Sequence, residues 1–343
     1  MAASPTTAST SKLPSLTDSH GRIIRDLRVS ITDRCNYRCV YCRTGELGPQ
    51  YAELSSGEYL RLIRCFVDLG ITKVRLTGGE PLLRRGIVDM VRELATMRTP
   101  AGGSLELALT TNGHLLDSLA VPLKAAGLHR VTVSMDAVDP AVFERITRVH
   151  GSFKSVLEGV RAARAAGLTP LKINCVLLRG FNDDQIEGFV RFAREEEVEV
   201  RFIEFMPLEE GRLWSPEIVV PLKEVVERIN RVQPLIEIPP REPSETARRY
   251  GFSDGSGVIG IIAPVSQAFC GACSRVRLTS DGKIRTCLFS QGEHDLQSLA
   301  RSGADDDQLR AFIVRAIELK EARHHIGEPG FLKPSRSMVH LGG

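Results

Sequence analysis

The sequence lacks long apolar runs, strong net charge and a high density of cysteine. Nowhere in its 343 residues do about 18 apolar residues follow one another, so no segment has the composition of a transmembrane helix. A net charge of +3 is too small for the concentrated basic surface typical of nucleic-acid binding. Eight cysteines are too few for a disulfide scaffold. With 42% hydrophobic and 25% charged residues, the chain is neither disordered nor fibrous, and we expect a globular protein without nucleic-acid or membrane partners.

The first twenty residues differ in composition from the rest, being rich in Ser, Thr, Ala and Pro. They contain no apolar stretch of the kind that a secretory signal needs. Two interpretations remain, a flexible tail over residues 1–20 or an organelle transit peptide, although arginine is absent before Arg22. Without an export signal we expect a cytoplasmic protein, in which clustered cysteines indicate metal or redox sites.

Strand and helix patterns alternate regularly up to about residue 210. β-branched runs predict six strands, at Leu27–Thr32, Lys73–Thr77, Leu105–Thr110, Arg130–Ser134, Leu171–Leu177 and Glu199–Phe205. Apolar spacing of three and four predicts helices between them, among them Tyr59–Leu69, Ile87–Met97, Phe153–Ala166 and Ile186–Arg194. Gly70, Gly127 and Gly167 stand where a helix-ending glycine is expected. The order predicts an α/β fold with a parallel sheet, either open or curved into a partial (βα)6 TIM-like barrel, with its site at the carboxyl ends of the strands.

The pattern changes after residue 210. A proline-rich segment precedes residues Tyr250–Ile262, whose pattern predicts a β-hairpin around Asp254–Gly257. A helix is predicted at Gln308–Glu321. We therefore expect three parts: a tail at 1–20, a barrel at 21–210, and an extension at 211–343 that packs on the barrel.

A first cysteine cluster, Cys35, Cys39 and Cys42, follows the first predicted strand on one tight loop. Structural zinc usually takes four ligands, so three thiolates would need a distant histidine to complete a zinc site. On a 4Fe–4S cluster, three thiolates leave one iron open to a small molecule. Cys65 and Cys175 lie within a helix pattern and a strand pattern, and we interpret them as packing residues.

A second cluster lies near the carboxyl end of the chain, at Cys270, Cys273 and Cys287. It again offers three thiolates. His294 is the nearest histidine in sequence and is able to complete a zinc site. The alternative is a second 4Fe–4S cluster with an open iron.

The first loop, with Tyr41 before its third cysteine, resembles the signature of the radical S-adenosylmethionine superfamily. The resemblance implies that the three cysteines hold a 4Fe–4S cluster whose open iron binds the methionine group of the cofactor, and that an electron then cleaves the cofactor to a 5′-deoxyadenosyl radical. It also implies S-adenosylmethionine contacts at Tyr41, at Gly79 of a Gly-Gly-Glu-Pro loop, at Ser134 and at Met206. Taken alone, the Gly-Gly loop would be an ordinary turn, Ser134 a strand end and Met206 a core side chain.

The second triad and its Arg275-Val276-Arg277 triplet narrow the resemblance to the GTP 3′,8-cyclases of molybdenum cofactor biosynthesis, from about Arg22 to the final Gly342-Gly343. Such lyases are iron–sulfur, nucleotide-binding enzymes in which a second 4Fe–4S cluster, here on Cys270, Cys273 and Cys287, binds guanine. The radical removes the ribose 3′ hydrogen of GTP, and C3′ bonds to C8 to give (8S)-3′,8-cyclo-7,8-dihydroguanosine 5′-triphosphate. The resemblance further implies an electron donor, a cyclic pyranopterin monophosphate synthase that takes the product, and a monomer or homodimer.

Cations on the predicted strands suit a triphosphate. Arg28, Lys73, Arg75 and Lys172 occupy three strands, where barrel interiors usually hold apolar side chains. Each alternatively pairs with a carboxylate at the rim. The resemblance assigns GTP binding to Arg28, Arg75, Thr110, Lys172, Arg275, Val276 and Arg277. It also implies that the Gly342-Gly343 tail enters the active site and supports catalysis; the alternative is a frayed chain end.

Two rival interpretations remain, and one feature departs from the family. After the third cysteine the family commonly continues with Met-Pro, whereas this chain has Arg43-Thr44. The first rival is a peptide-modifying radical enzyme with an auxiliary cluster. The second is a zinc-stapled binding module without catalysis.

Overall fold

The computed structural model describes residues 15–42 and 50–342. Arg43, Thr44 and Gly343, on which expectations rest, lie outside the described residues. Leu16 is buried and Thr17 pairs with Ile23. Residues 15–20 therefore pack on the fold, although we expected the tail to extend to residue 20.

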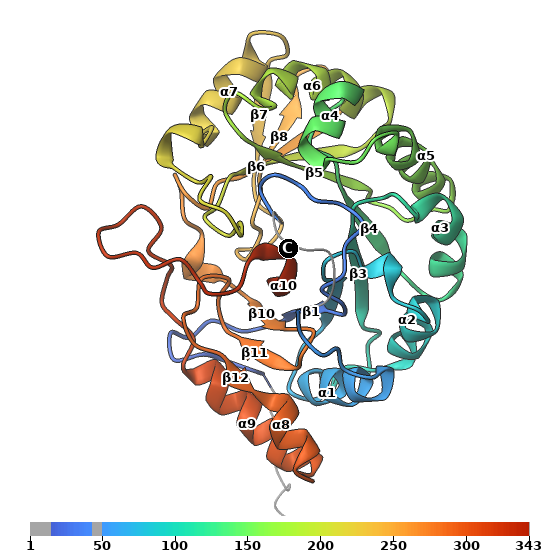
Figure 1. The fold of residues 1–343 in the computed structure, drawn as a ribbon, viewed down its shortest axis with the longest axis vertical. Helices are drawn as coiled ribbons and strands as arrows, with labels where there is room; N and C mark the ends of the chain where they lie inside the picture. The colour runs from blue at the N-terminus through green and yellow to red at the C-terminus, as the bar shows by residue number, and fades with distance from the viewer. Residues whose placement is uncertain (1–14, 43–49, 343) are drawn as a thin grey trace, which may run out of the picture.

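Six parallel strands form the centre of the fold and follow one another in chain order. They are β1 (Asp26–Ser30), β2 (Lys73–Thr77), β3 (Glu106–Thr111), β4 (Arg130–Ser134), β5 (Lys172–Leu177) and β6 (Glu199–Glu204). Their bounds lie within two residues of the predicted ones. Figure 1 shows the strands curved around the middle of the molecule with the helices outside them. The partial (βα)6 barrel is therefore confirmed and the open sheet is not.

The barrel helices cover the outer face of the strands. They are α1 (Ser56–Asp68), α2 (Ile87–Thr96), α3 (Leu116–Ala125), α4 (Pro140–Thr147), α5 (Ser152–Ala165), α6 (Ile186–Glu195) and α7 (Leu222–Asn230). Short 3-10 turns are η1 (Pro81–Leu83), η2 (Asp183–Gln185), η3 (Pro216–Ile218) and η4 (Cys270–Ala272). Helix starts have local causes: Ser55 and Glu58 form a capping box on α1. No helix in the described ranges is long and apolar enough to cross a membrane.

Strand side chains alternate between an apolar outer face and a polar inner face, because successive residues of a strand point to opposite sides. On β1, Leu27 and Val29 belong to the buried core cluster. Arg28, between them, lines a cavity inside the barrel. The interior is thus built for polar groups, unlike the packed apolar interior usual in this architecture.

The carboxyl-terminal part adds strands to both edges of the barrel sheet. Its elements are β7 (Leu235–Ile238), β8 (Arg248–Phe252), β9 (Val258–Ile262), β10 (Arg275–Leu278), β11 (Lys283–Arg285), β12 (His294–Asp295), α8 (Leu296–Arg301), α9 (Asp306–Glu318) and α10 (Met338–Leu341). The β8–β9 hairpin is confirmed, and the last predicted helix ends three residues early as α9. β9 pairs parallel with β6 and β10 parallel with β1. The extension therefore continues the sheet, whereas we expected it to pack on the barrel.

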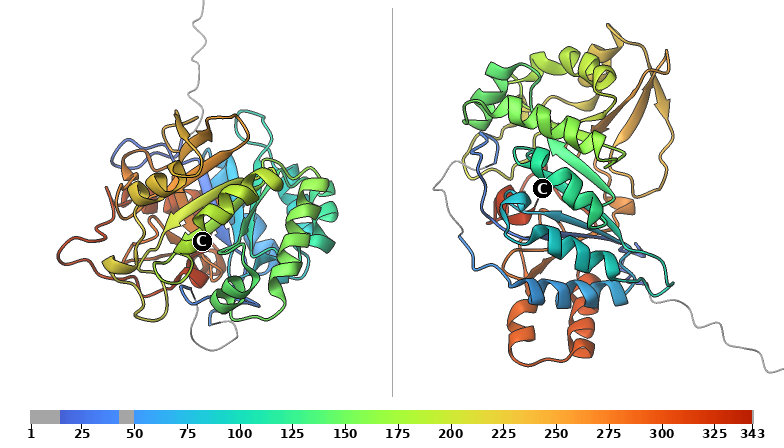
Figure 2. Two further views of the ribbon diagram at one scale, coloured as in Figure 1. Left: turned by 90° about the horizontal axis from the view of Figure 1, so that it is seen from above. Right: turned by 90° about the vertical axis from the view of Figure 1, so that its right-hand side faces the viewer.

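The last helix, α10, lies inside the curve of the strands. Figure 1 shows it near the middle of the molecule beside β10 and β1, and the side view in Figure 2 also places it inside the outer helices. α10 and Gly342 therefore lie near the carboxyl ends of β1 and β2.

Candidate active site

Both cysteine triads line one cavity of about 290 Å³. Its lining also includes residues from the carboxyl ends of the barrel strands, among them Thr77, Thr110, Ser134 and Val176. A cavity of this size lies near the lower end of small-molecule sites. The arrangement brings together the two groups of cysteines, which are more than 200 residues apart in the sequence.

The Gly-Gly loop after β2 packs directly on the first cysteine loop. The Gly79 N–H donates to the Thr32 carbonyl at 2.7 Å, and the Glu80 N–H to the Arg34 carbonyl at 2.7 Å. A Cβ at Gly78 would lie 2.3 Å from the Thr32 oxygen, and one at Gly79 would lie 2.2 Å from the Arg34 oxygen. The glycines are thus required by the close approach of the first cysteine loop, where no Cβ would fit.

Two buried carboxylates, which the sequence analysis missed, fix this loop region. Glu80 accepts hydrogen bonds from Thr111 Oγ1 (2.7 Å) and the Asn112 N–H (2.7 Å). The Asn112 amide then donates to Asn36 Oδ1, within the cysteine loop, at 2.7 Å. Burial raises the pKa of Glu80 to about 7. Glu80 therefore connects the ends of β2 and β3 to the first triad.

The second of these carboxylates, Asp136, holds Tyr41. The Tyr41 hydroxyl donates to Asp136 Oδ2 at 2.7 Å, and the Val176 N–H donates to Oδ1 at 2.9 Å. Burial raises the pKa of Asp136 to about 6. The aromatic residue of the cysteine loop is therefore fixed from β4 and β5.

All four positions predicted to contact S-adenosylmethionine line the cavity: Tyr41, Gly79, Ser134 and Met206. Each triad supplies three thiols to the same space, which fits a 4Fe–4S cluster on each. Within the described ranges no three His, Cys, Asp or Glu side chains come close enough to hold one metal ion. His294 pairs with Ile284 at the sheet edge and is not among the residues of the cavity wall. The position of His294 thus argues against a zinc site completed by this residue.

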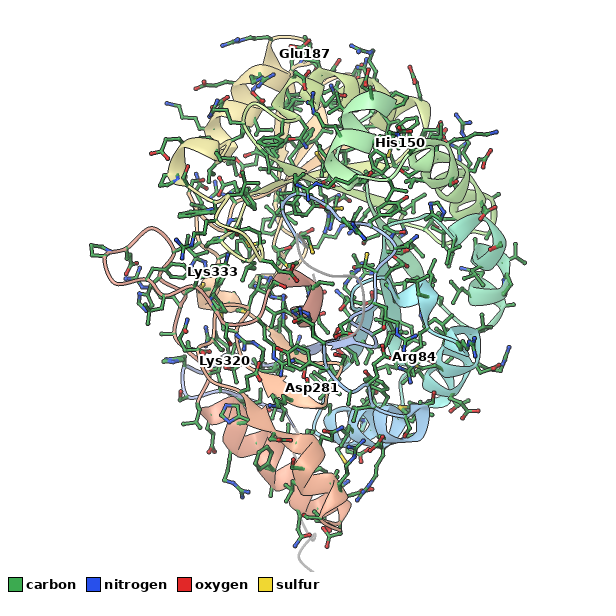
Figure 3. The ribbon with its side chains drawn as sticks, in the orientation of Figure 1. Arg84, His150, Glu187, Asp281, Lys320 and Lys333 are labelled. Carbon is green, nitrogen blue, oxygen red and sulfur yellow. The ribbon has the colours of Figure 1, made fainter. Side chains whose placement is uncertain are left out.

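The second triad lies beside positive charge. Arg275 donates from Nη2 to Cys273 Sγ at 3.3 Å. Lys320, which the sequence analysis missed, donates to the Arg275 carbonyl at 3.0 Å and also to the Thr286 carbonyl; its place in the carboxyl-terminal part is labelled in Figure 3. Burial raises the pKa of Cys273, but the charges of Arg275 and Lys320 outweigh it and bring the pKa to about 6. The site therefore favours a thiolate.

Three arginines form the cationic wall of the cavity: Arg28, Arg275 and Arg277. Arg28 and Arg277 are register neighbours on β1 and β10. Burial, and next the charge of Arg275, lower the pKa of Arg28 to about 10. Burial and the charge of Arg28 also lower the pKa of Arg277, whose Nε has no hydrogen-bond partner among the described residues. Buried like charges of this kind are typical of a site for an anion.

The other residues predicted to bind GTP do not all line the cavity. Thr110 lines the cavity and accepts a hydrogen bond from Arg75 Nη1 at 3.0 Å. Lys172 is buried, with its Nζ 4.0 Å from a Glu199 oxygen. Val276 is completely buried in the apolar core, so its side chain does not face the cavity.

Some barrel cations pair with carboxylates. The Lys73 ammonium lies 3.1 Å from Asp26, so for Lys73 the pairing alternative is correct. Arg201, not predicted, lies 2.5 Å from Glu199. The register of β1 and β2, which sets Asp26 opposite Lys73, was not deducible from the sequence alone.

The segment from Met338 to Gly342 contacts the cavity. Met338 and Val339 line it, and a Cβ at Gly342 would lie 2.0 Å from Thr77 Oγ1. Gly342 also has a φ of +69°, which favours glycine. The tail therefore reaches the ends of β1 and β2 of its own chain, which favours the interpretation of a tail in the site over that of a frayed end.

A partial parallel barrel with a three-cysteine loop after its first strand defines a radical S-adenosylmethionine enzyme. The model of the Radical SAM superfamily matches residues 29–193, and that of Molybdenum Cofactor Synthesis C matches residues 198–326. The crystal structure of Streptococcus suis SuiB bound to S-adenosylmethionine has a TM-score of 0.60 at 15% identity, over 86% of this chain and 69% of that one. At this identity the likeness concerns the fold.

Curated relatives match over nearly the whole chain. The GTP 3′,8-cyclase of Moorella thermoacetica is 45% identical over 95% of this chain and 99% of its own. That of Streptomyces coelicolor is 43% identical over 96% of both chains, and the mitochondrial one of Arabidopsis thaliana is 39% identical over 96% of this chain and 83% of its own. The chain belongs to the GTP 3′,8-cyclase family. This membership decides against both the peptide-modifying enzyme and the zinc-stapled binding module.

Proposed function

We propose that this protein is a GTP 3′,8-cyclase that uses S-adenosylmethionine and two 4Fe–4S clusters in the first step of molybdenum cofactor biosynthesis. The product is (8S)-3′,8-cyclo-7,8-dihydroguanosine 5′-triphosphate. The observation that carries the proposal is the shared cavity, in which two cysteine triads and a cationic wall enclose one space. Family membership over the full length of the relatives supports the same activity.

When bound, the clusters supply an electron to S-adenosylmethionine and an open iron to the guanine base. The chain supplies position and exclusion of water. Tyr41, held by Asp136, and the Gly79 backbone, held by Thr32, would orient the cofactor near the first triad. Ile203 and Phe205 give the cavity an apolar wall, which protects a radical from water.

The cationic wall would hold the triphosphate. Arg277 is buried and Arg28 beside it is partly buried. Arg275 lies next to the second triad, with its guanidinium 5.0 Å from the centre of the Phe269 ring. A charge-assisted hydrogen bond contributes about 1.5–3 kcal/mol, so four or five contacts support micromolar binding after ordering costs. Lys172 and Arg75, which lie within the barrel, would complete the anion site.

Several expectations stay predictions. They are the electron donor, the downstream synthase, a cytoplasmic location, a monomer or homodimer, and the division of the chain near residue 210. The edge pairing of β9 and β10 joins the two parts in one sheet, so we expect them to unfold together.

An anaerobic assay tests the function. Reconstituted protein is incubated with reductant, S-adenosylmethionine and GTP, and 5′-deoxyadenosine and the cyclised nucleotide are quantified together. We expect both products in equal amounts and roughly eight iron atoms per chain, two clusters of four. Cys287→Ser serves as control: we expect it to keep the first cluster and some cofactor cleavage without nucleotide product. Absence of the cyclised nucleotide from the fully loaded enzyme would refute the proposal.

A further inference from the structure

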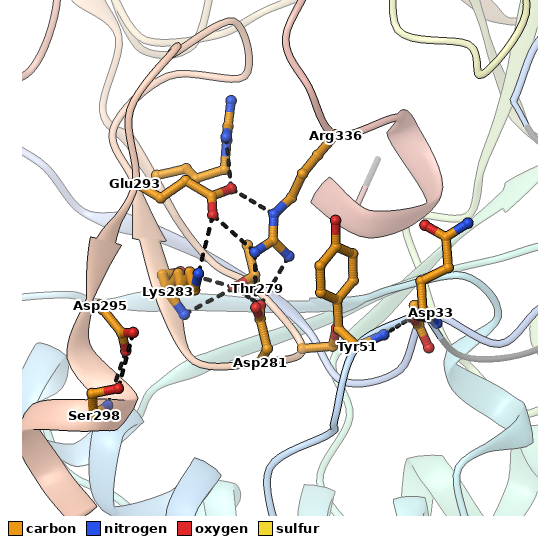
Figure 4. Close-up of polar contacts among 12 residues, drawn as sticks. Asp33, Tyr51, Thr279, Asp281, Lys283, Glu293, Asp295, Ser298 and Arg336 are labelled. Atoms are coloured by element: carbon orange, nitrogen blue, oxygen red, sulfur yellow. Dashed lines mark hydrogen bonds and ion pairs between the residues drawn. The ribbon is translucent and has the colours of Figure 1, made fainter.

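The segment before α10 is anchored by one buried arginine. Arg336 is 3% exposed. Its Nη1 and Nη2 donate to Asp281 Oδ1 and Oδ2 at 2.9 and 2.8 Å, as Figure 4 shows. Two parallel bonds to one carboxylate fix the orientation of the guanidinium as well as its position.

The other edge and the face of the same guanidinium are also occupied. Its Nε lies 2.5 Å from Glu293 Oε1, and Nη2 donates to Glu293 Oε2 at 2.8 Å. The Cζ of Arg336 lies 4.0 Å from the centre of the Tyr51 ring, so the guanidinium stacks over that ring. Arg336 thus joins three segments that are remote in sequence, and we call Arg336, Asp281, Glu293 and Tyr51 the arginine anchor.

The partners in the arginine anchor lie next to the first cysteine loop and on the hairpin that follows Cys273. Asp281 lies in the turn between β10 and β11, the hairpin between Cys273 and Cys287. The Tyr51 N–H donates to Asp33, two residues before the first cysteine, at 3.0 Å. The turn with Asp281 is at the opposite end of this hairpin from the two cysteines. Arg336 is therefore linked closely to the first cysteine loop, and to the second triad only through the length of β10 and β11.

On its other side, Arg336 leads directly into the segment that reaches the cavity. Ser337 precedes α10, and the Met338 N–H donates to the Leu208 carbonyl at 2.8 Å. Gly342 follows α10 and packs against Thr77 at the cavity. With so short a helix between them, a shift of Arg336 would move Gly342 by a similar amount.

We propose that Arg336 is a positioning residue that holds α10 and Gly342 at the cavity through the arginine anchor, so that radical formation stays coupled to GTP conversion. The inference rests on the proposed function. Arg336 touches neither triad nor the cavity wall and acts through the tail. Lysine cannot replace it, because a point charge does not make two forked contacts at once.

The test compares four variants with the wild type: Arg336→Ala, Arg336→Lys, deletion of residues 342–343, and the deletion combined with Arg336→Ala. Arg310→Ala is the control, since Arg310 pairs with Asp68 and Asp307 on outer helices. A misplacement of about 1 Å in a reacting site costs up to about 100-fold, so we expect Arg336→Ala and Arg336→Lys to lose about 10- to 100-fold in cyclised nucleotide. Both should retain iron and form more 5′-deoxyadenosine than nucleotide. Hydrogen–deuterium exchange should accelerate over residues 338–342.

The combined variant discriminates between positioning and general stability. If Arg336 acts through the tail, Arg336→Ala adds little to the deletion. The inference would be overturned if the losses of cyclised nucleotide from Arg336→Ala and from the deletion were additive. It would also be overturned if both Arg336 variants formed 5′-deoxyadenosine and nucleotide in the same ratio as the wild type. If Arg336→Ala does not fold, Arg336→Lys and its exchange pattern decide alone. A wild type that forms no nucleotide would instead refute the proposed function.

Discussion

Replacing Arg277 by methionine tests the cationic wall. Arg277 is 6% exposed, and its charge lies beside those of Arg28 and Arg275. Burial, and then the charge of Arg28, lower its pKa, so the ligand-free enzyme holds this charge against both desolvation and repulsion. Methionine keeps much of the volume and removes the charge. We therefore expect the ligand-free Arg277→Met variant to be at least as stable as the wild type.

The same substitution should weaken GTP binding. One charge-assisted contact of about 1.5–3 kcal/mol corresponds to a loss of about 10- to 150-fold in affinity. Equilibrium binding of GTP to the reconstituted enzyme, with iron content and thermal unfolding measured on the same samples, checks both parts. Retained affinity for GTP with both clusters intact would refute the assignment of the wall to the triphosphate. Lower stability without ligand would refute the argument from repulsion.

Two further predictions concern pH and loop packing. Burial, and then the charge of Arg201, lower the pKa of Lys172 to about 7. A bound triphosphate would raise the pKa of Lys172 again, so binding should take up a proton and GTP affinity should fall from pH 7 to 9. Calorimetry in two buffers measures the proton uptake. Lys172→Arg should abolish both effects. Because the unfolded chain binds this proton up to about pH 10.4, Lys172 should make the ligand-free enzyme more stable as pH rises from 7 to that value; a decrease attributable to Lys172 would contradict the sign. Gly79→Ala should lose S-adenosylmethionine binding and about 1–3 kcal/mol of stability, since its Cβ would meet the Arg34 oxygen at 2.2 Å. Gly57→Ala is the control and should lose neither, because the space around its Cβ is open. Equal behaviour of the two variants would contradict the packing argument.

Much of the barrel was predictable because its signals are local. The runs at Lys73–Thr77 and Arg130–Ser134 coincide with β2 and β4, since β-branched residues shortly after a helix-ending glycine leave little ambiguity. The cysteine loops were recognisable from their spacing. The place of the first triad follows from the rule that sites lie at the carboxyl ends of barrel strands. That the second triad shares its cavity did not follow from this rule, because Cys273 precedes β10 and Cys287 follows the antiparallel β11.

Features that depend on distant pairing were not predictable. β10 pairs with β1 across some 250 residues, so the extension was expected on the barrel and instead continues its sheet. The pairing of Lys73 with Asp26 depends on the register between β1 and β2. Arg336 carries no local signal, because its partners Asp281 and Tyr51 become neighbours only in the folded chain.

The fate of the ribose 3′ hydrogen tests the central claim, that one cavity brings a radical precursor and GTP together. The enzyme is incubated anaerobically with reductant, S-adenosylmethionine and GTP deuterated at C3′, and the 5′-deoxyadenosine is analysed by mass spectrometry. The shared cavity predicts 5′-deoxyadenosine carrying one deuterium and a cyclised nucleotide without it. Unlabelled 5′-deoxyadenosine accompanied by cyclised nucleotide would contradict direct transfer between the two halves of the site.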